Sequence, residues 1–155
     1  MLPKTDVFII AEIAQAHDGS LGIAHSYIDA LADAGVDAVK FQTHIAEAES
    51  SIFEPFRVKF SYEDDTRFDY WKRMEFTEQQ WAGLKEHCEA RGVEFMSSPF
   101  SGAAVELLNR LGVKRFKVGS GEVNNLLLLH QIAQTGKEII LSSGMSNFSE
   151  LDKTI

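Results

Sequence analysis

A unit of amphipathic helix, glycine and strand repeats four times along this chain of 155 residues. The four copies read "LADAGVDAVKF", "CEARGVEFMSS", "LNRLGVKRFKV" and "IAQTGKEIILS". In each copy a glycine follows a helical spacing of apolar residues, where a residue in the left-handed conformation ends a helix without a Cβ penalty. An apolar run typical of a buried strand begins at once. Together with the opening run "VFIIAEIA", the pattern predicts five strands, four intervening helices and the beginning of a further helix.

Polar residues stand where the helices are expected to begin. Thr77 with Gln80 and Asn147 with Glu150 match or approximate capping boxes, and Ser101 is a further N-cap candidate. Strands that alternate with helices predict a parallel sheet covered by helices, because a parallel connection must cross back over the sheet. The pattern alone leaves two α/β folds open, a doubly wound sheet and a barrel.

One connection, residues 44–76, is much longer than the usual loop between a strand and a helix. It contains the stretch "FRVKFSYEDDTRFDYWKRMEF", which is rich in aromatic and charged residues. Such a density of aromatic side chains argues against a disordered linker. We expect this insertion to cover a substrate site.

The composition is that of an ordinary globular protein, with 45% hydrophobic and 25% charged residues. No apolar run approaches the roughly 20 residues that span a bilayer, and the N-terminus lacks the features of a signal peptide, so we expect a cytoplasmic protein without a membrane partner. The formal net charge of −8 argues against nucleic-acid binding. The single cysteine, Cys88, excludes an internal disulfide and is expected to be a packed thiol on a helix face.

The ends of the predicted strands are unusually polar. In "AVKFQT", Lys40 and Gln42 share one face of a strand, opposite Val39 and Phe41. Because parallel strands end at the same edge of a sheet, polar residues there converge from distant parts of the sequence. The residues concerned are Glu12, Lys40, Gln42, Ser97, Ser98, Lys117, Ser120, Glu122, Ser142 and Ser143.

Two lysines surrounded by hydroxyls predict a site for a compact anion, with phosphate the natural candidate, and we expect them to line one cavity. The alternative is an internal salt-bridge network of Lys40 and Lys117 with Glu12 and Glu122. His17 and His44 also follow strand ends. We expect both to be polar groups of the site rather than metal ligands.

The motifs "FIIAEIAQAHDGSLGIAHSYIDALADAGVDAVKFQT", "FMSSPF", "FKVGSGEVNNLLLL" and "IILSSGM" resemble, in order and spacing, the N-acetylneuraminate (sialic acid) synthase family. The resemblance covers essentially the whole chain. It implies a (β/α)₈ TIM barrel that condenses phosphoenolpyruvate with an N-acylated amino sugar, such as N-acetylmannosamine, to give a nonulosonic acid and phosphate. It therefore favours the barrel over the doubly wound sheet.

The resemblance also implies roles for individual residues. Phosphoenolpyruvate is expected at Lys40, Ser98, Lys117, Ser120 and Ser142. Glu12 and Glu122 match catalytic positions, and Gln42 and His17 lie on the sugar side. Where many members have His-Asn-Gly, this chain has Asp18 in place of the asparagine, which leaves the choice of sugar open.

Members of the family are longer than this chain. The resemblance therefore implies that residues 1–155 form the N-terminal portion of the barrel, about its first five βα units, without the later strands and the antifreeze-like domain. It further implies a divalent metal, Mn²⁺ or Mg²⁺, held by histidines outside this chain, and a homodimer in the full-length form. We expect the 155-residue chain alone to be inactive. Two other readings stay open: a non-catalytic barrel fragment, and an aldolase that forms a Schiff base through a strand-end lysine.

Overall fold

The structure is a computed structural model and describes residues 7–155. Five parallel strands form one sheet in the order β1-β2-β3-β4-β5. Consecutive strands are neighbours throughout, whereas a doubly wound sheet reverses its order at a switch point, so the topology is that of a barrel wall. The strands are β1 (Ile10–Ala14), β2 (Ala38–Thr43), β3 (Glu94–Pro99), β4 (Arg115–Val118) and β5 (Glu138–Leu141).

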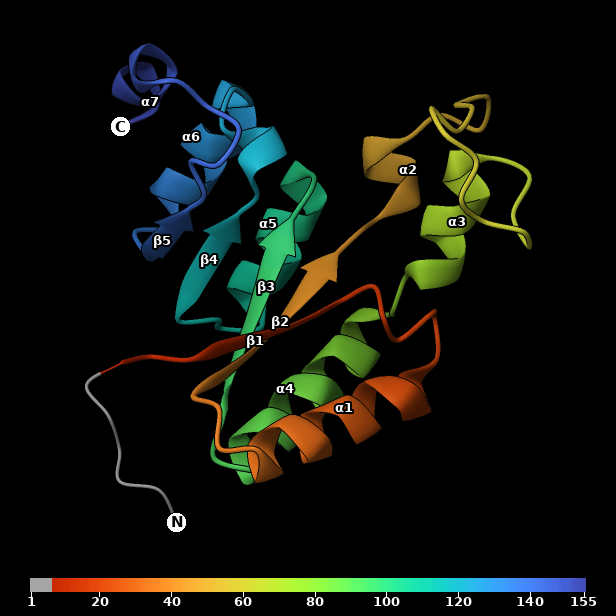
Figure 1. Cartoon of the computed structure of the whole chain (residues 1–155), viewed down its shortest axis with the longest axis vertical. Helices are drawn as coiled ribbons and strands as arrows, with labels where there is room; N and C mark the ends of the chain where they lie inside the picture. The colour runs from red at the N-terminus through yellow and green to blue at the C-terminus, as the bar shows by residue number, and fades with distance from the viewer. Residues whose placement is uncertain (1–6) are drawn as a thin grey trace.

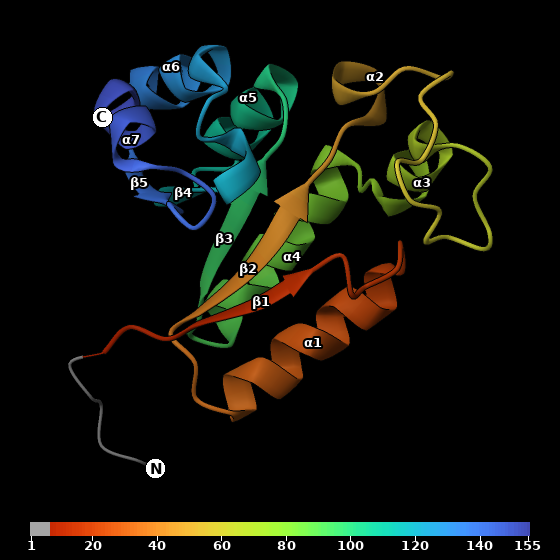
Figure 2. The ribbon, with the colours of Figure 1, turned by 45° about the horizontal axis from the view of Figure 1, so that its top comes forward.

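The four expected crossover helices are present, and a further helix follows β5. They are α1 (Leu21–Asp33), α4 (Glu78–Ala90), α5 (Gly102–Arg110), α6 (Leu126–Gln134) and α7 (Phe148–Thr154). Thr77 and Asn147 form the predicted capping boxes, and the Ser101 side chain accepts a hydrogen bond from the amide of Ala104. In both views α1 and α4 lie side by side along one face of the sheet (Figures 1 and 2).

The long insertion is ordered and contains two short helices that sequence reasoning did not resolve. They are α2 (Ala46–Glu49) and α3 (Arg67–Met74). Figure 1 shows both beyond the end to which β2 points, joined by an extended loop. A single 3-10 turn, η1 (Ser120–Glu122), follows β4. The insertion therefore stands at the carboxyl end of the sheet, where the polar strand-end residues lie.

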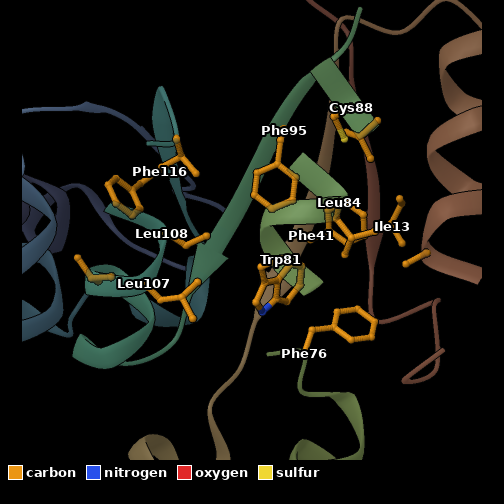
Figure 3. Close-up of a cluster of buried hydrophobic side chains, with 14 of the residues drawn as sticks. Ile13, Phe41, Phe76, Trp81, Leu84, Cys88, Phe95, Leu107, Leu108 and Phe116 are labelled. Atoms are coloured by element: carbon orange, nitrogen blue, oxygen red, sulfur yellow. The ribbon is translucent and has the colours of Figure 1, made fainter. Parts of the chain in front are cut away.

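A hydrophobic core fills the space between the sheet and its helices. Phe41 of β2 stacks on Phe95 of β3 with ring centroids 5.5 Å apart, and its ring meets Trp81 of α4 edge-on at 5.7 Å. Figure 3 shows these rings with Leu84 and Cys88 of α4 in the same cluster. Burial raises the pKa of the Cys88 thiol to about 12, which confirms the predicted packed thiol and argues against a nucleophile.

Because Val39 and Phe41 pack into this core, Lys40 and Gln42 must point to the other side of the sheet. The alternation read from "AVKFQT" is therefore correct. Within residues 7–155, no helix has both the length and the apolar character needed to cross a membrane.

Candidate active site

Glu12 of β1 and Lys40 of β2 are direct neighbours in the strand register. The Glu12 carboxylate lies 2.5 Å from the Lys40 ammonium, and the lysine side chain is only 9% exposed against 50% for the glutamate. β1 is irregular immediately after Glu12, where its register with β2 shifts before Ala14, and Ala14 has a φ of 49°. Such bulges re-aim side chains at the ends of strands. One half of the alternative salt-bridge network, the pair of Lys40 and Glu12, is therefore present.

Lys117 of β4 has a different environment. Its ammonium donates to the backbone carbonyl of Val118 at 2.6 Å. Among the described residues, no carboxylate lies within 4 Å of this ammonium. Partial burial lowers the pKa of Lys117, and the positive charge of Lys40 lowers it further. The negative charge of Glu12 raises this pKa. The two ammonium groups are thus close enough to repel each other. Glu122 does not neutralise Lys117, since its carboxylate accepts from the Asn125 amide at 2.9 Å.

The three serines assigned to the anion lie at the carboxyl ends of the strands, Ser98 within β3, Ser120 after β4 and Ser142 after β5. Ser98 lies opposite Gln42 in the strand register and is buried. Ser120 begins η1, and the backbone amide of Ser142 donates to Val118. Within the described residues, the hydroxyls of all three serines have no hydrogen-bond partner on the protein. They are free to donate to a ligand.

A cavity of about 310 Å³ opens between the strand ends and the insertion. Its lining residues are Gln42, His44, Glu49, Arg67, Trp71, Phe100 and Glu122. Only Gln42 and Glu122 come from the set assigned to substrate or catalysis. The two lysines and three serines assigned to the anion are not among these lining residues, so their convergence on one site stays a prediction. The Lys40 ammonium donates to the Glu12 carboxylate, and that of Lys117 donates to a carbonyl of its own strand.

His44 is the centre of an aromatic stack beside this cavity. Its ring lies between those of Trp71 and Phe100, with centroid separations of 3.7 and 4.2 Å and interplanar angles of 11° and 13°. Nδ1 of His44 is 2.7 Å from the Glu49 carboxylate, and Nε2 is 3.3 Å from the Gln42 side-chain oxygen. Two acceptors therefore face the two ring nitrogens. The expected polar role of His44 in the site fits this arrangement.

Gln15 joins the same network from the end of β1. Its side-chain amide donates to the Gln42 oxygen at 3.3 Å, while its own side-chain oxygen is buried without a partner among the described residues. A buried acceptor without a donor is costly, and a ligand can supply the missing donor. Gln15 was not selected from the sequence.

His17 follows β1, and its expected position on the sugar side stays a prediction. It is fully buried, its ring centroid is 4.7 Å from that of Phe76, and its Nδ1 accepts from the amide of Gly19 at 3.1 Å. Burial lowers its pKa to about 4, so the ring is neutral near pH 7. It is not among the residues that line the cavity.

Arg73 of α3 ties the insertion to the turn after β1. Its guanidinium donates to the Asp64 carboxylate at 2.8 Å and to the Asp18 carboxylate at 2.6 Å. The hydrogen bond from Arg73 also lowers the pKa of Asp64. Asp18, whose identity left the choice of sugar open, therefore faces Arg73 and does not line the cavity. In this structure its carboxylate holds the insertion in place.

Sequence reasoning did not select Glu49, Arg67, Trp71 or Phe100 individually. Three of them lie in the insertion, whose aromatic content was the available sign, and Phe100 ends the motif "FMSSPF". Their convergence depends on how α2 and α3 fold back, which no local pattern predicts. Within residues 7–155, no three His, Cys, Asp or Glu residues are arranged to hold a metal ion. A divalent metal held by histidines outside this chain stays a prediction.

Comparison with known proteins bears on this arrangement. The family model described as NeuB family matches residues 27–155. The chain belongs to the NeuB family. It is 36% identical over 150 residues to the N,N'-diacetyllegionaminic acid synthase of Campylobacter jejuni, covering 95% of this chain and 45% of that protein. It is 35% identical to the N-acetylneuraminate-9-phosphate synthase of Homo sapiens, covering 93% of this chain and 41% of that protein.

The fold of this NeuB-family chain matches solved structures as well. The N-acetylneuraminic acid (sialic acid) synthetase of Leptospira borgpetersenii superimposes with a TM-score of 0.81 at 31% identity, over 97% of this chain and 49% of that one. The α/β fold with the first five βα units of a TIM barrel is thereby confirmed. The chain spans less than half the length of the curated relatives it matches.

Proposed function

We propose that this NeuB-family chain is the N-terminal part of a synthase that condenses phosphoenolpyruvate with an N-acylated amino sugar, giving a nonulosonic acid and phosphate. The observation that carries the proposal is the pair Lys40 and Lys117, whose ammonium groups repel each other while, among residues 7–155, only Lys40 has a carboxylate partner. An anion placed between them relieves that repulsion. The free hydroxyls of Ser98, Ser120 and Ser142 lie at the same strand ends and can complete its coordination.

The proposed chemistry assigns the two glutamates separate tasks. C3 of phosphoenolpyruvate forms a bond to the aldehyde carbon of the open-chain sugar, and the aldehyde oxygen takes a proton. Water adds at C2, after which the C–O bond to phosphate breaks and a ketone remains. Glu122, which lines the cavity, is proposed to orient or deprotonate this water. Glu12 is proposed to hold sugar hydroxyls or to assist, because its carboxylate is half exposed beside Lys40.

The finer features of the whole protein are proposals of the same kind. A divalent metal, Mn²⁺ or Mg²⁺, would supply Lewis-acid chemistry from ligands outside this chain, and the full-length protein is proposed to be a cytoplasmic homodimer. The relatives include synthases of phosphorylated and of unphosphorylated products, so their names alone leave the sugar undecided.

A Schiff-base aldolase is the second candidate, and the lowered pKa of Lys117 favours it. An amine with a depressed pKa is a better nucleophile at neutral pH. Borohydride reduction in the presence of pyruvate would attach a three-carbon adduct to Lys117 if this candidate were right. Absence of the adduct, together with phosphate release from phosphoenolpyruvate, would favour the synthase.

The deciding experiment uses the full-length protein that carries this segment. We expect inorganic phosphate from phosphoenolpyruvate, N-acetylmannosamine and MnCl₂, and an acid three carbons longer than the sugar by mass spectrometry. Lys114→Met should leave this phosphate release unchanged, because Lys114 is 76% exposed at the opposite end of β4. A protein that binds neither substrate but self-associates would instead support the non-catalytic reading. The 155-residue chain alone is expected to show no turnover.

A further inference from the structure

The amide of Gln42 is held by its oxygen. The Gln15 amide donates to this oxygen at 3.3 Å, and Nε2 of His44 lies 3.3 Å from it as well. Among residues 7–155, the NH₂ group of Gln42 has no acceptor on the protein, and it is not one of the buried polar groups that lack a partner. Since Gln42 lines the cavity, this NH₂ group is the part that a ligand meets. Gln42 therefore offers a ligand a donor.

Both ring nitrogens of His44 face oxygens. Nδ1 lies 2.7 Å from the Glu49 carboxylate, which can only accept, and Nε2 faces the Gln42 oxygen. A ring nitrogen without a proton would set its lone pair against a lone pair of oxygen. The observed contacts therefore require a proton on each nitrogen. The ion pair is shielded from water, because the His44 and Glu49 side chains are 3% and 8% exposed.

The ring of His44 has no room to turn over. Trp71 and Phe100 cover its two faces with nearly parallel rings at 3.7 and 4.2 Å, so rotation of the imidazole would drive its edge into one of them. The Gln42 amide is less confined, because it borders the cavity and its terminal torsion is broad and roughly two-fold. When the contact between the two groups changes, the amide is the part that reorients.

Two carboxylates and a second histidine lie around this ring. Glu49 of α2 contacts it, and Glu122 of η1 lines the same cavity. Burial lowers the pKa of His17, the charge of Asp18 opposes this shift, and the charge of His44 lowers the pKa further, to about 4 in all. His17 is therefore neutral near pH 7. Among the described residues, His44 is the histidine that lines the cavity.

The cations of α3 nearest in sequence to the aromatic stack are paired with carboxylates other than Glu49. Arg67 lies 2.8 Å from Glu54, and Lys72 lies 3.0 Å from Glu75. Among residues 7–155, no lysine or arginine lies within 4 Å of Glu49. Its carboxylate therefore retains the Nδ1 proton of the imidazole, and the proton on Nε2 is the one that is lost as the pH rises.

We infer that His44 is a positioning residue whose Nε2 proton decides which end of the Gln42 amide faces the cavity, an inference that rests on the proposed function. While this proton is present, it holds the Gln42 oxygen and leaves the NH₂ group to the ligand. When the proton passes to solvent, a lone pair on Nε2 faces that oxygen. The amide then turns over, so that its NH₂ group donates to Nε2 and its oxygen faces the cavity.

Gln15 takes part in the same change. Its NH₂ group donates to Gln42, while its oxygen is buried without a partner among the described residues. Once the Gln42 amide has turned over, two NH₂ groups would face each other, so the Gln15 amide turns over too. Its oxygen then accepts from the second N–H of Gln42, which removes the cost of an unpaired buried acceptor. The three side chains thus have two arrangements, and the proton on His44 selects between them.

A measurement without substrate, on the full-length protein that carries this segment, tests the protonation of His44. A charged imidazole quenches the fluorescence of an indole stacked on it, so the emission of Trp71 should rise between about pH 5 and 8. The Trp71 signal is the difference between the wild type and Trp71→Phe, which keeps an aromatic ring against His44. Glu49→Gln removes the negative partner and should move the transition to lower pH, whereas His130→Gln, at an exposed site, should leave it in place. A wild type without this transition overturns the inference.

The KM for N-acetylmannosamine at saturating phosphoenolpyruvate tests the effect on the Gln42 amide. An acceptor atom of the sugar that meets the NH₂ group loses its donor when the amide turns over, so the wild-type KM should rise about 3- to 10-fold from about pH 6 to about pH 8. His44→Gln supplies an NH₂ donor that does not titrate. Its KM should stay near the wild-type value at low pH throughout this range, and its fluorescence transition should be absent. His44→Leu supplies no donor and should have a raised KM at every pH.

The same dependence of KM on pH in His44→Gln as in the wild type overturns the inference. If circular dichroism shows both His44 variants to be unfolded, an unmoved fluorescence transition in Glu49→Gln overturns it instead. Absence of phosphate release with any N-acylated amino sugar contradicts the proposed function, whereas the fluorescence transition does not depend on turnover. The two failures are therefore distinguishable.

Discussion

The charge of Lys40 depresses the pKa of Lys117 although the two lysines lie on β2 and β4, with β3 between them. The strand register places both side chains on the same face of the sheet, since Lys40 is opposite Met96 of β3 and Phe116, just before Lys117, is opposite Ser97. Glu12, bound to Lys40, acts on Lys117 with the opposite sign. This coupling of three residues is the electrostatic framework of the proposed anion site.

The coupling predicts opposite responses to two substitutions. Lys40→Met removes a positive neighbour and should raise the pKa of Lys117, whereas Glu12→Gln removes a negative neighbour and should lower it. The Lys117 pKa is measurable by NMR of its side-chain nitrogen across a pH titration. Lys114→Met, at the far end of β4, should leave it unchanged. Shifts of the same sign in both variants would show that the three groups are not coupled as described.

Much of the fold could be predicted because it depends on local rules. The glycines at 35, 92, 112 and 136 all adopt a positive φ at helix ends, as the repeated unit requires. The predicted helix caps form, and the long insertion is ordered. These features depend on a few neighbouring residues, so one sequence is enough to find them.

The composition of the cavity could not be predicted, because it depends on contacts between distant segments. Nothing near Trp71 in the sequence shows that its ring will stack on His44. The sequence likewise does not show that Arg67 will form an ion pair with Glu54. Nor does the sequence show that the ring of His17, which follows β1, will be buried against Phe76. Position along a strand predicts the end of the sheet on which a side chain lies, but not its neighbours.

The close contact of Gly19 with α3 predicts a large cost for a single methyl group. Gly19 has a φ of 75°, and a Cβ there would overlap the carbonyl oxygen of Arg73. Gly35 has a similar φ of 83° with nothing near its Cβ position, so Gly35→Ala measures the backbone penalty alone, about 1–2 kcal/mol. Gly19→Ala should cost a further 1–3 kcal/mol or so, as overpacking does. Urea denaturation measures both, and equal costs would mean that the turn can move away from α3.

The buried ring of His17 predicts a specific loss of stability in acid. The pKa of His17 in the folded chain, about 4, lies below its ordinary value of 6.5, so the unfolded chain binds the proton first. The neutral His17 ring contributes fully to the free energy of unfolding above pH 6.5. This contribution decreases as the pH falls towards 4, by up to about 3 kcal/mol at about 1.36 kcal/mol per pKa unit. His17→Asn keeps an acceptor for the Gly19 amide but does not titrate. It should be less stable near pH 7 yet lose less between pH 6.5 and 4, whereas His130→Gln, at an exposed site, should behave like wild type.

The last prediction separates binding from catalysis in the full-length protein that carries this segment. Lys117 is proposed to contact phosphoenolpyruvate in both the ground state and the transition state, so Lys117→Met should chiefly raise the KM for phosphoenolpyruvate. Glu122 is proposed to act only as water attacks C2. Glu122→Gln, nearly equal in size, should therefore lower kcat by roughly 10²–10⁴-fold with little change in KM.

Steady-state phosphate release, with phosphoenolpyruvate varied at saturating sugar, distinguishes the two effects once circular dichroism shows both variants folded. Glu63→Gln supplies the control for removing a carboxylate without touching the cavity. A near-normal kcat with a raised KM in Glu122→Gln would make Glu122 a binding residue. The catalytic assignment would then pass to Glu12, whose carboxylate is half exposed beside Lys40, and Glu12→Gln should in that case show the loss of kcat.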